Sequence, residues 1–130
     1  MNETPRTPSE MERLPPMTHY VIGLLHRAPA PPRRTKEMAE TLQEQHLAHL
    51  RQLREAGELI TTGPIEEDVA LRGILVFRTD QVSKARQLMA VDPLVAGGYL
   101  LLDLYTWFSP AGLTLSGGPP TAPSLTFESD

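Results

Sequence analysis

The sequence HLAHLRQLREAGELITTGP, residues 46–64, contains the change of pattern that decides the fold. Apolar side chains recur in its first half, and in the residues before it, at the spacing of one helical face: Met38, Leu42, Leu50 and Leu53. Gly57 then stands where helices commonly end in a left-handed residue. The run ELITTGP (58–64) follows at once, with strand-forming side chains and a final Gly-Pro. The stretch therefore predicts a helix joined directly to a strand.

The residues upstream add one strand to this unit. The helix is predicted from Thr35 to Ala56, with Thr35 as its N-cap. A proline-rich loop, RAPAPP (27–32), separates it from the apolar run HYVIGLLH (19–26), which is typical of a strand. Alternation along that strand places one apolar set on each face, with Tyr20, Ile22 and Leu24 opposite Val21 and Leu25.

Two further strands and a second helix are predicted downstream. RGILVFRT (72–79) is typical of a strand, and Thr79 or Asp80 is expected to cap the helix that follows. That helix ends ahead of Pro93, because proline disfavours helical geometry in the residue before it. The apolar run YLLLDLYTWF (99–108) predicts the last strand. The order of these elements is that of a ferredoxin-like β-α-β-β-α-β fold of the α+β class, with an antiparallel sheet.

The predicted sheet has more apolar surface than two helices can cover. The strands at 19–26 and 99–108 carry apolar side chains on both faces, whereas the helices can lie on only one. An open apolar face on a small protein usually marks an association surface. We therefore expect a homodimer in which two sheets pack face to face about a two-fold axis. The alternative is a monomer whose own tails cover the second face.

Proline distribution sets the expected domain bounds. The 13 prolines concentrate near the two ends and in one loop, and the ends hold too little apolar surface to fold. We expect one domain over residues 18–109, between a disordered tail at 1–17 and a flexible Pro/Gly-rich tail at 110–130. Met17 stands directly before the first strand-like run, which leaves it open as the natural start.

Composition excludes several classes of function. A formal net charge of −4 argues against a nucleic-acid partner, which requires a concentrated basic surface. The chain has no cysteine, hence no disulfide, thiolate nucleophile or cysteine-bound metal. No apolar run is long enough to span a membrane, and the N-terminus lacks the features of a signal peptide. We expect a cytoplasmic protein with no membrane partner.

Two histidines and one aspartate are candidate functional residues. His46 and His49 stand one turn apart on the predicted helix, and His46 falls on its apolar face. Histidine has an ordinary pKa near neutrality, so a histidine on a buried face is a candidate proton-transfer group. Two other interpretations stay open for His46: a core residue bonded to a backbone carbonyl, or half of a metal site shared with His49. Asp92 before Pro93 is explained equally well as a turn residue whose carboxylate accepts backbone N–H groups.

Three stretches, in order and at fitting separations, resemble the YciI-like (YCII-related) family of small bacterial proteins. They are HYVIGLLHR, HLAHLRQLREAGELITTGP and RGILVFRTDQVSKARQLMAVDPLVAGG, which together span nearly the whole expected domain. The resemblance implies a dimeric α/β barrel. It also implies a catalytic pair formed by His46, eleven residues before Gly57, and by Asp92 of the Asp-Pro turn, and it gives His49 no role.

The resemblance further implies a cofactor-independent lyase or isomerase that uses the pair for general acid–base chemistry on a small organic molecule. The best-understood relatives are dehydrochlorinases of chlorinated hydroxyquinols. Many relatives have an aromatic residue after Asp-Pro, where this chain has leucine. We expect the substrate pocket to be lined by Tyr20, Leu24, Thr62, Gly63, Pro64 and Leu94. Two alternatives on the same fold are a non-catalytic small-molecule binding or accessory module and a cofactor-independent monooxygenase. None of these functions calls for a bound metal or cofactor.

Overall fold

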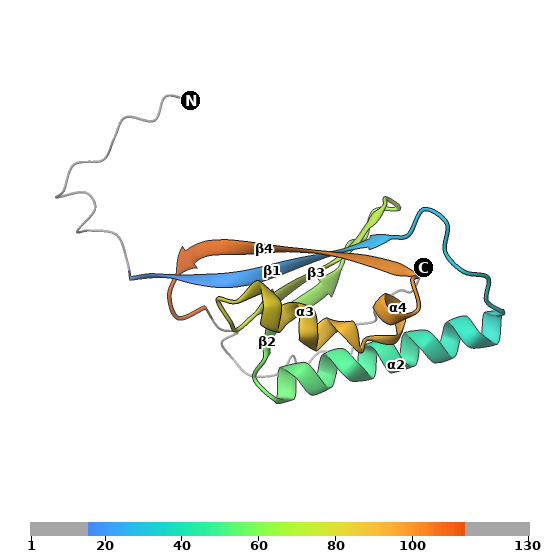
Figure 1. The fold of residues 1–130 in the computed structure, drawn as a ribbon, viewed down its shortest axis with the longest axis horizontal. Helices are drawn as coiled ribbons and strands as arrows, with labels where there is room; N and C mark the ends of the chain where they lie inside the picture. The colour runs from blue at the N-terminus through green and yellow to red at the C-terminus, as the bar shows by residue number, and fades with distance from the viewer. Residues whose placement is uncertain (1–15, 114–130) are drawn as a thin grey trace, which may run out of the picture.

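The computed structural model describes residues 16–113, so most of the two expected tails lies outside the described residues. The first strand begins at Met17 and the last ends at Pro110, each one residue beyond the expected domain. Figure 1 shows the sheet as one layer and the helices as a second layer on one of its faces. The elements are β1 (Met17–Arg27), α2 (Lys36–Glu55), β2 (Leu59–Pro64), β3 (Leu71–Phe77), α3 (Val82–Ala90), α4 (Pro93–Ala96) and β4 (Leu100–Pro110).

The four strands form one antiparallel sheet in the order β2-β3-β1-β4. This order and the sequence of elements confirm the predicted ferredoxin-like α+β fold. The short helix α4 is an addition to the prediction, since it inserts one helical turn between α3 and β4. It begins at Pro93, the residue that ends the preceding helical pattern, and this placement suits proline because the first helical position needs no N–H.

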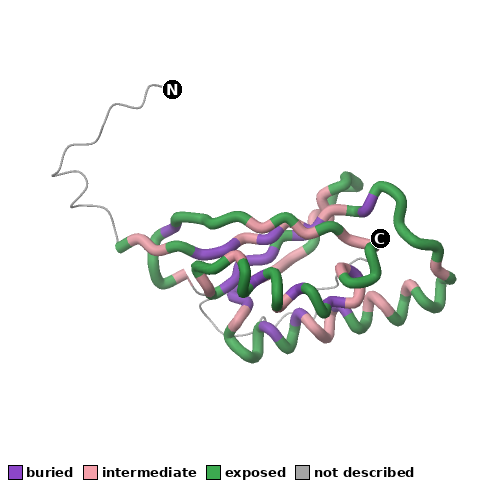
Figure 2. Tube along the Cα trace, viewed as in Figure 1, coloured by how far each residue is buried: buried purple, intermediate pink, exposed green. Residues whose placement is uncertain are grey.

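The main core lies between the sheet and the helices. Val21 and Leu25 of β1 point into it, and Figure 2 shows how buried positions recur along β1 and on α2. Burying a side chain of this size stabilises the fold by about 1.5–3 kcal/mol, so this layer is the principal source of stability. The other buried members of this core are Leu50, Leu53, Leu59, Leu75, Phe77, Ala85 and Met89.

Helix α2 begins and ends as the sequence predicts. Thr35 is the N-cap, and its Oγ1 accepts a hydrogen bond from the backbone N–H of Met38 at 3.1 Å. Gly57 follows the helix with a φ of 77°, in the left-handed region that favours glycine. The expected apolar face is buried only in the second half of the helix. In the first half, Met38 is 49 % exposed. Figure 1 shows the reason, since the first turns of α2 extend past the end of the sheet.

The predicted cap of the second helix is wrong. The N-cap of α3 is Gln81, which makes no side-chain capping bond. Thr79 uses its Oγ1 to accept from the backbone N–H of Gln81 at 3.1 Å, which makes a turn ahead of the helix. Neither Thr79 nor Asp80 is therefore the N-cap.

The second face of the sheet, which we call the open face, carries a smaller apolar cluster. Tyr20, Ile60 and Val76 are buried there, and the Tyr20 hydroxyl accepts from the backbone N–H of Leu113 at 3.0 Å. The first residues after β4 thus cover part of this face. Large apolar side chains on the same face stay exposed: Ile74, Leu101, Tyr105 and Trp107. Within residues 16–113, no helix combines the length and the apolar character needed to cross a membrane.

Candidate active site

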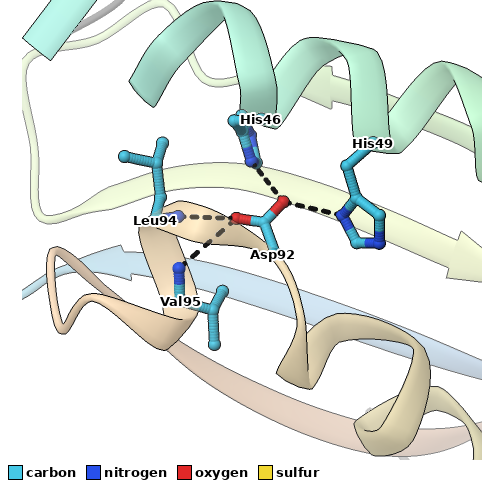
Figure 3. A network of polar contacts seen from close by, with 5 residues as sticks. All are labelled: His46, His49, Asp92, Leu94 and Val95. Atoms are coloured by element: carbon cyan, nitrogen blue, oxygen red, sulfur yellow. Dashed lines mark hydrogen bonds and ion pairs between the residues drawn. The ribbon is translucent and has the colours of Figure 1, made fainter. Parts of the chain in front are cut away.

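Asp92 lies at the junction of α3 and α4 and is fully buried. One of its carboxylate oxygens, Oδ1, accepts from the backbone N–H groups of Leu94 at 3.0 Å and Val95 at 3.3 Å. These bonds make Asp92 the N-cap of α4 and confirm its predicted role in the turn. They also fix the direction of the carboxylate, so that Oδ2 faces α2 (Figure 3).

The second oxygen of Asp92, Oδ2, accepts a hydrogen bond from each of the two candidate histidines. His46 donates from Nδ1 to Oδ2 at 2.7 Å, and His49 donates from Nδ1 to the same atom at 2.9 Å (Figure 3). An ionised carboxylate can only accept, so the Nδ1 atom of each ring carries a hydrogen and donates it to Oδ2. The two interpretations of Asp92, turn residue and partner of His46, therefore hold together, one on each oxygen.

Two opposing effects act on the pKa of Asp92. Burial by itself raises that pKa, because desolvation disfavours the charged form. The hydrogen bond and charge of His46 lower it, as do the hydrogen bonds from His49 and from the amide of Val95. The lowering effects prevail, and the pKa of Asp92 lies below the ordinary value of an aspartate. The carboxylate is therefore ionised at neutral pH despite its burial.

A cavity of about 460 Å³ opens beside His46, between α2 and the ends of β1, β2 and β3. That volume is within the range of small-molecule sites. His46 lines the cavity while only 7 % exposed, and Nε2 has no hydrogen-bond partner within the described residues. The histidine is thus oriented by Asp92 on one side, and on the other its second ring nitrogen bonds to no residue among 16–113. Much of the remaining wall is apolar, from Leu25, Leu47, Leu50 and Leu100.

The structure divides the expected pocket residues into two groups. Thr62, Gly63, Pro64 and Leu94 line the cavity with His46. Tyr20 and Leu24 do not, because they lie on the open face of β1, whereas Leu25 on the helix-covered face lines the cavity. Successive side chains of a strand point to opposite faces, so Leu25 faces the cavity while Tyr20 and Leu24 face away from it. Tyr20 and Leu24 are accordingly left out of the proposed binding site.

His49 is the candidate residue to which the resemblance gave no role. It does not line the cavity, and its Nε2 is buried with no hydrogen-bond partner in the described part of the chain. The signal was its position three residues after His46, because residues three apart on a helix share a face. The same spacing also raised the metal interpretation. Both Nδ1 atoms point at one carboxylate oxygen, and no group of three or more His, Cys, Asp or Glu among residues 16–113 is arranged to hold a metal ion.

Comparison with known proteins identifies the family. The model of the YCII-related domain matches residues 24–107, more than half of the chain. The chain belongs to the YCII-related family. The matched segment of this YCII-related protein contains His46, His49 and Asp92, together with the cavity residues Thr62 and Leu94.

Two further comparisons concern individual proteins. No curated protein matches the sequence of this YCII-related protein. A similar solved structure is 5-chloro-2-hydroxyhydroquinone dehydrochlorinase from Burkholderia phenoliruptrix, in complex with 2,5-dihydroxybenzoquinone. It shares 15 % identity and a TM-score of 0.47, over 66 % of this chain and 92 % of that chain.

Proposed function

We propose that this YCII-related protein is a cofactor-independent lyase or isomerase in which His46 is the general base. The observation that carries the proposal is the orientation of His46, which donates from Nδ1 to the buried carboxylate of Asp92 and lines the cavity with its ring. A nucleophile or base held in place by a second, charged group is the common arrangement for proton transfer in enzymes.

The proposed chemistry begins with removal of a proton from carbon. Nε2 of His46 takes the proton, and the imidazolium that forms is stabilised by the negative charge of Asp92 through Nδ1–H. The electron pair of the broken C–H bond then forms a carbon–carbon double bond. In an elimination, a leaving group such as chloride departs with the electron pair of its bond to carbon, and His46 then passes the proton to water. In an isomerisation, the electron pair of an adjacent double bond shifts to the next atom, which takes the proton back from His46. Either outcome balances without an oxidant, reductant or cofactor.

The walls of the cavity support this assignment. Leu47, Leu50 and Leu94 line the cavity together with His46, and their apolar side chains limit water in it. Proton abstraction benefits from a site of low polarity, because charge interactions are stronger there than in water. Thr62 supplies little polarity of its own, since its hydroxyl already donates to the carbonyl oxygen of Ile74 at 2.8 Å.

We also propose that the protein acts in the cytoplasm as a homodimer through its open face. The proposal is supported by the exposed apolar side chains that β3 and β4 leave on that face, among them Leu101 and Tyr105, 50 % and 52 % exposed. A second copy presents the same surface about a two-fold axis, so each apolar patch covers the other. The dimeric α/β barrel expected for the family has this arrangement.

Exchange of carbon-bound hydrogen for deuterium tests the proposal, because it reports proton abstraction whatever product the reaction forms. The protein is incubated in D₂O with a panel of small carbonyl compounds, carboxylic acids and chlorinated hydroxyquinols, and exchange or elimination is followed by NMR. We expect His46→Ala to abolish the reaction that the native protein catalyses. His19→Ala is the matched control, because His19 is exposed and lies outside the cavity. Activity that survives His46→Ala overturns the proposal, and ligand binding with no exchange by the native protein favours the binding-module alternative.

A further inference from the structure

Helix α2 faces the cavity with one continuous row of side chains. The row consists of Gln43, His46, Leu47 and Leu50, which follow the spacing of a single helical face. Gln43 stands one turn before His46 and is half-buried. The proposed base therefore shares its face of α2 with one neutral hydrogen-bonding group.

The carboxamide of Gln43 is not committed to the protein, since it forms no hydrogen bond with any residue among 16–113. The hydroxyl of Thr62, which also lines the cavity, differs in this respect because it donates to the carbonyl oxygen of Ile74 at 2.8 Å. A polar group on the wall of a cavity is satisfied by the molecule that fills the cavity when no protein group competes for it. Gln43 can therefore direct its NH₂ group at a bound molecule.

Gln43 lies within reach of the same bound molecule as His46. Side chains three residues apart on a helix have Cβ atoms about 5–6 Å apart, and both lean toward the N-terminal end of the helix. The hydrogen bond from Nδ1 of His46 to Asp92 at 2.7 Å fixes the ring, so its second nitrogen keeps one direction relative to Gln43 (Figure 3). A molecule whose C–H group meets this nitrogen can place an oxygen atom, a bond or two farther along, at the carboxamide.

Proton abstraction from carbon explains why the base needs such a neighbour. The electron pair left on carbon is stabilised when an adjacent carbonyl group takes it up as negative charge on oxygen. A hydrogen-bond donor aimed at that oxygen stabilises the charge as it forms, and the side-chain amide of glutamine is one of the groups that enzymes use for this.

We propose that Gln43 is a further catalytic residue and that the substrate is a carbonyl compound. The carbonyl oxygen accepts from the NH₂ group of Gln43, and the adjacent carbon faces His46. This inference rests on the proposed function for the role of His46, whereas the hydrogen bond from Gln43 to the carbonyl group can be measured without catalysis.

The proposed step moves one proton and two electron pairs. Nε2 of His46 takes the proton from the carbon beside the carbonyl group, and the electron pair of that C–H bond forms a double bond to the carbonyl carbon. The π electron pair of the C=O bond moves to the oxygen, which becomes an enolate that accepts from Gln43. Return of a proton or deuteron from His46 to carbon reverses these movements and restores the carbonyl group, so hydrogen exchange needs only solvent.

Tyr99 is the other candidate donor, because it lines the cavity and its hydroxyl bonds to no residue in the described part of the chain. Its ring is packed on two sides. The guanidinium carbon of Arg34 lies 4.5 Å from the ring centroid, and a Cβ added at Gly97 would lie 2.8 Å from Cε2 of the ring. Tyr99 stands before β4, on no element shared with the base, whereas the helical spacing from His46 favours Gln43.

Acetophenone labelled with ¹³C at its carbonyl carbon tests the proposal, because it is a one-ring ketone with exchangeable hydrogens beside the carbonyl group. A hydrogen bond to the oxygen moves the carbonyl carbon resonance downfield, so NMR reports this bond in the bound ketone. We expect the resonance to lie farther upfield in Gln43→Leu than in the native protein. In the same variant, kcat for deuterium exchange should fall by about 10²-fold with little change of KM.

Two further variants separate the donor from the shape of the side chain. Leucine continues the apolar row of α2 and is a good helix former, so Gln43→Leu should keep the fold. Gln43→Glu keeps nearly the native shape but has no N–H donor when ionised, and it should lose both the downfield resonance and the rate. Gln52→Leu is the matched control, since Gln52 is an exposed glutamine of α2 outside the cavity, and both readouts should stay as in the native protein.

The two proposals fail in different ways. Exchange that survives in His46→Ala refutes the proposed base alone, because the carbonyl resonance of the bound ketone should stay downfield in that variant. A resonance that is the same in the native protein and in Gln43→Leu overturns the role of Gln43, as does failure of acetophenone to bind the native protein at millimolar concentration. Loss of the downfield resonance in Tyr99→Phe but not in Gln43→Leu assigns the donor to Tyr99 and likewise overturns the proposal.

Discussion

His46 donates from Nδ1 to Oδ2 of Asp92 over 2.7 Å, although 46 positions separate the two residues in the chain. The same carboxylate accepts hydrogen bonds from His49 and from two backbone N–H groups, so four donors bond to one side chain. A carboxylate has enough lone pairs for four hydrogen bonds, and no neutral side chain of similar size does. Asp92 thereby joins α2 to the turn before β4 and orients the proposed base.

Asp92→Asn should damage both stability and activity. An amide has one accepting oxygen, so its NH₂ group must face some of the N–H donors that now surround Oδ1 and Oδ2. We expect the free energy of unfolding to fall by about 2–4 kcal/mol, measured by urea denaturation. Hydrogen exchange should slow by about 10²-fold or more because His46 loses its orientation. Asp80→Asn, at an exposed position, is the control, and equal stability of the two variants would contradict this account.

Acid should remove the stabilisation that Asp92 provides. The pKa of Asp92 is lowered in the folded protein, so folding favours the ionised form and the stabilisation is complete above the unfolded pKa of about 3.9. It is lost as the pH falls from there through the lower folded pKa. The difference in free energy of unfolding between native protein and Asp92→Asn should therefore shrink below about pH 4. If this difference in free energy of unfolding grew on acidification, the pKa of Asp92 would be raised by folding and not lowered.

His49 should act through Asp92 rather than on substrate, because it bonds to Oδ2 and does not line the cavity. Replacing it by leucine removes one donor, so the pKa of Asp92 should rise toward its ordinary value. His49→Gln keeps an N–H donor of comparable reach and should hold that pKa lower than leucine does. NMR titration of the Asp92 carboxyl carbon measures the pKa of Asp92 in each variant. The rate of substrate hydrogen exchange should also fall about tenfold in His49→Leu. An unchanged Asp92 titration in His49→Leu would exclude this positioning role.

The open face should control assembly. Tyr105→Asp places a charge in the proposed sheet-to-sheet interface, and the two-fold axis applies that change twice. We expect the dissociation constant of the dimer to rise by at least about a hundredfold, measured by sedimentation velocity over a range of concentrations. Val91→Asp is the matched control, because Val91 is an apolar residue 72 % exposed after α3, on the helical side of the molecule. A native protein that sediments as a monomer at all concentrations would refute the dimer.

Local patterns in the sequence were enough to predict the order of the elements. Thr35 and Gly57 act through bonds and backbone angles within a few residues of themselves, so their roles are visible in a short window. Asp92 was predicted as a turn residue for the same reason, while its pairing with His46 came from the resemblance to a family. The added helix α4 was missed because one helical turn has no apolar repeat to detect.

Contacts that depend on how elements pack could not be predicted. His49 reaches Asp92 only because of how α2 is rotated against the turn at α4, and periodicity gives a face but no such angle. Arg27, Arg34 and Arg72, which line the cavity, come from three separate parts of the chain, so no motif joins them. Tyr20 and Leu24 were assigned to the pocket because both faces of β1 are apolar, and alternation alone does not say which face the helices cover.

β1 has a different task on each side. Val21 and Leu25 contribute to the core, and Leu25 also to the cavity wall, while Tyr20, Ile22 and Leu24 belong to the open face. Insertion or deletion of one residue in the middle of this strand would turn every side chain beyond it to the other face of the sheet. Side chains of the core and cavity would then point to the open face, and those of the open face would point inward. The contribution of β1 to ligand preference can thus change by exchange of its side chains, whereas variation in chain length must be accommodated in the loops at its ends.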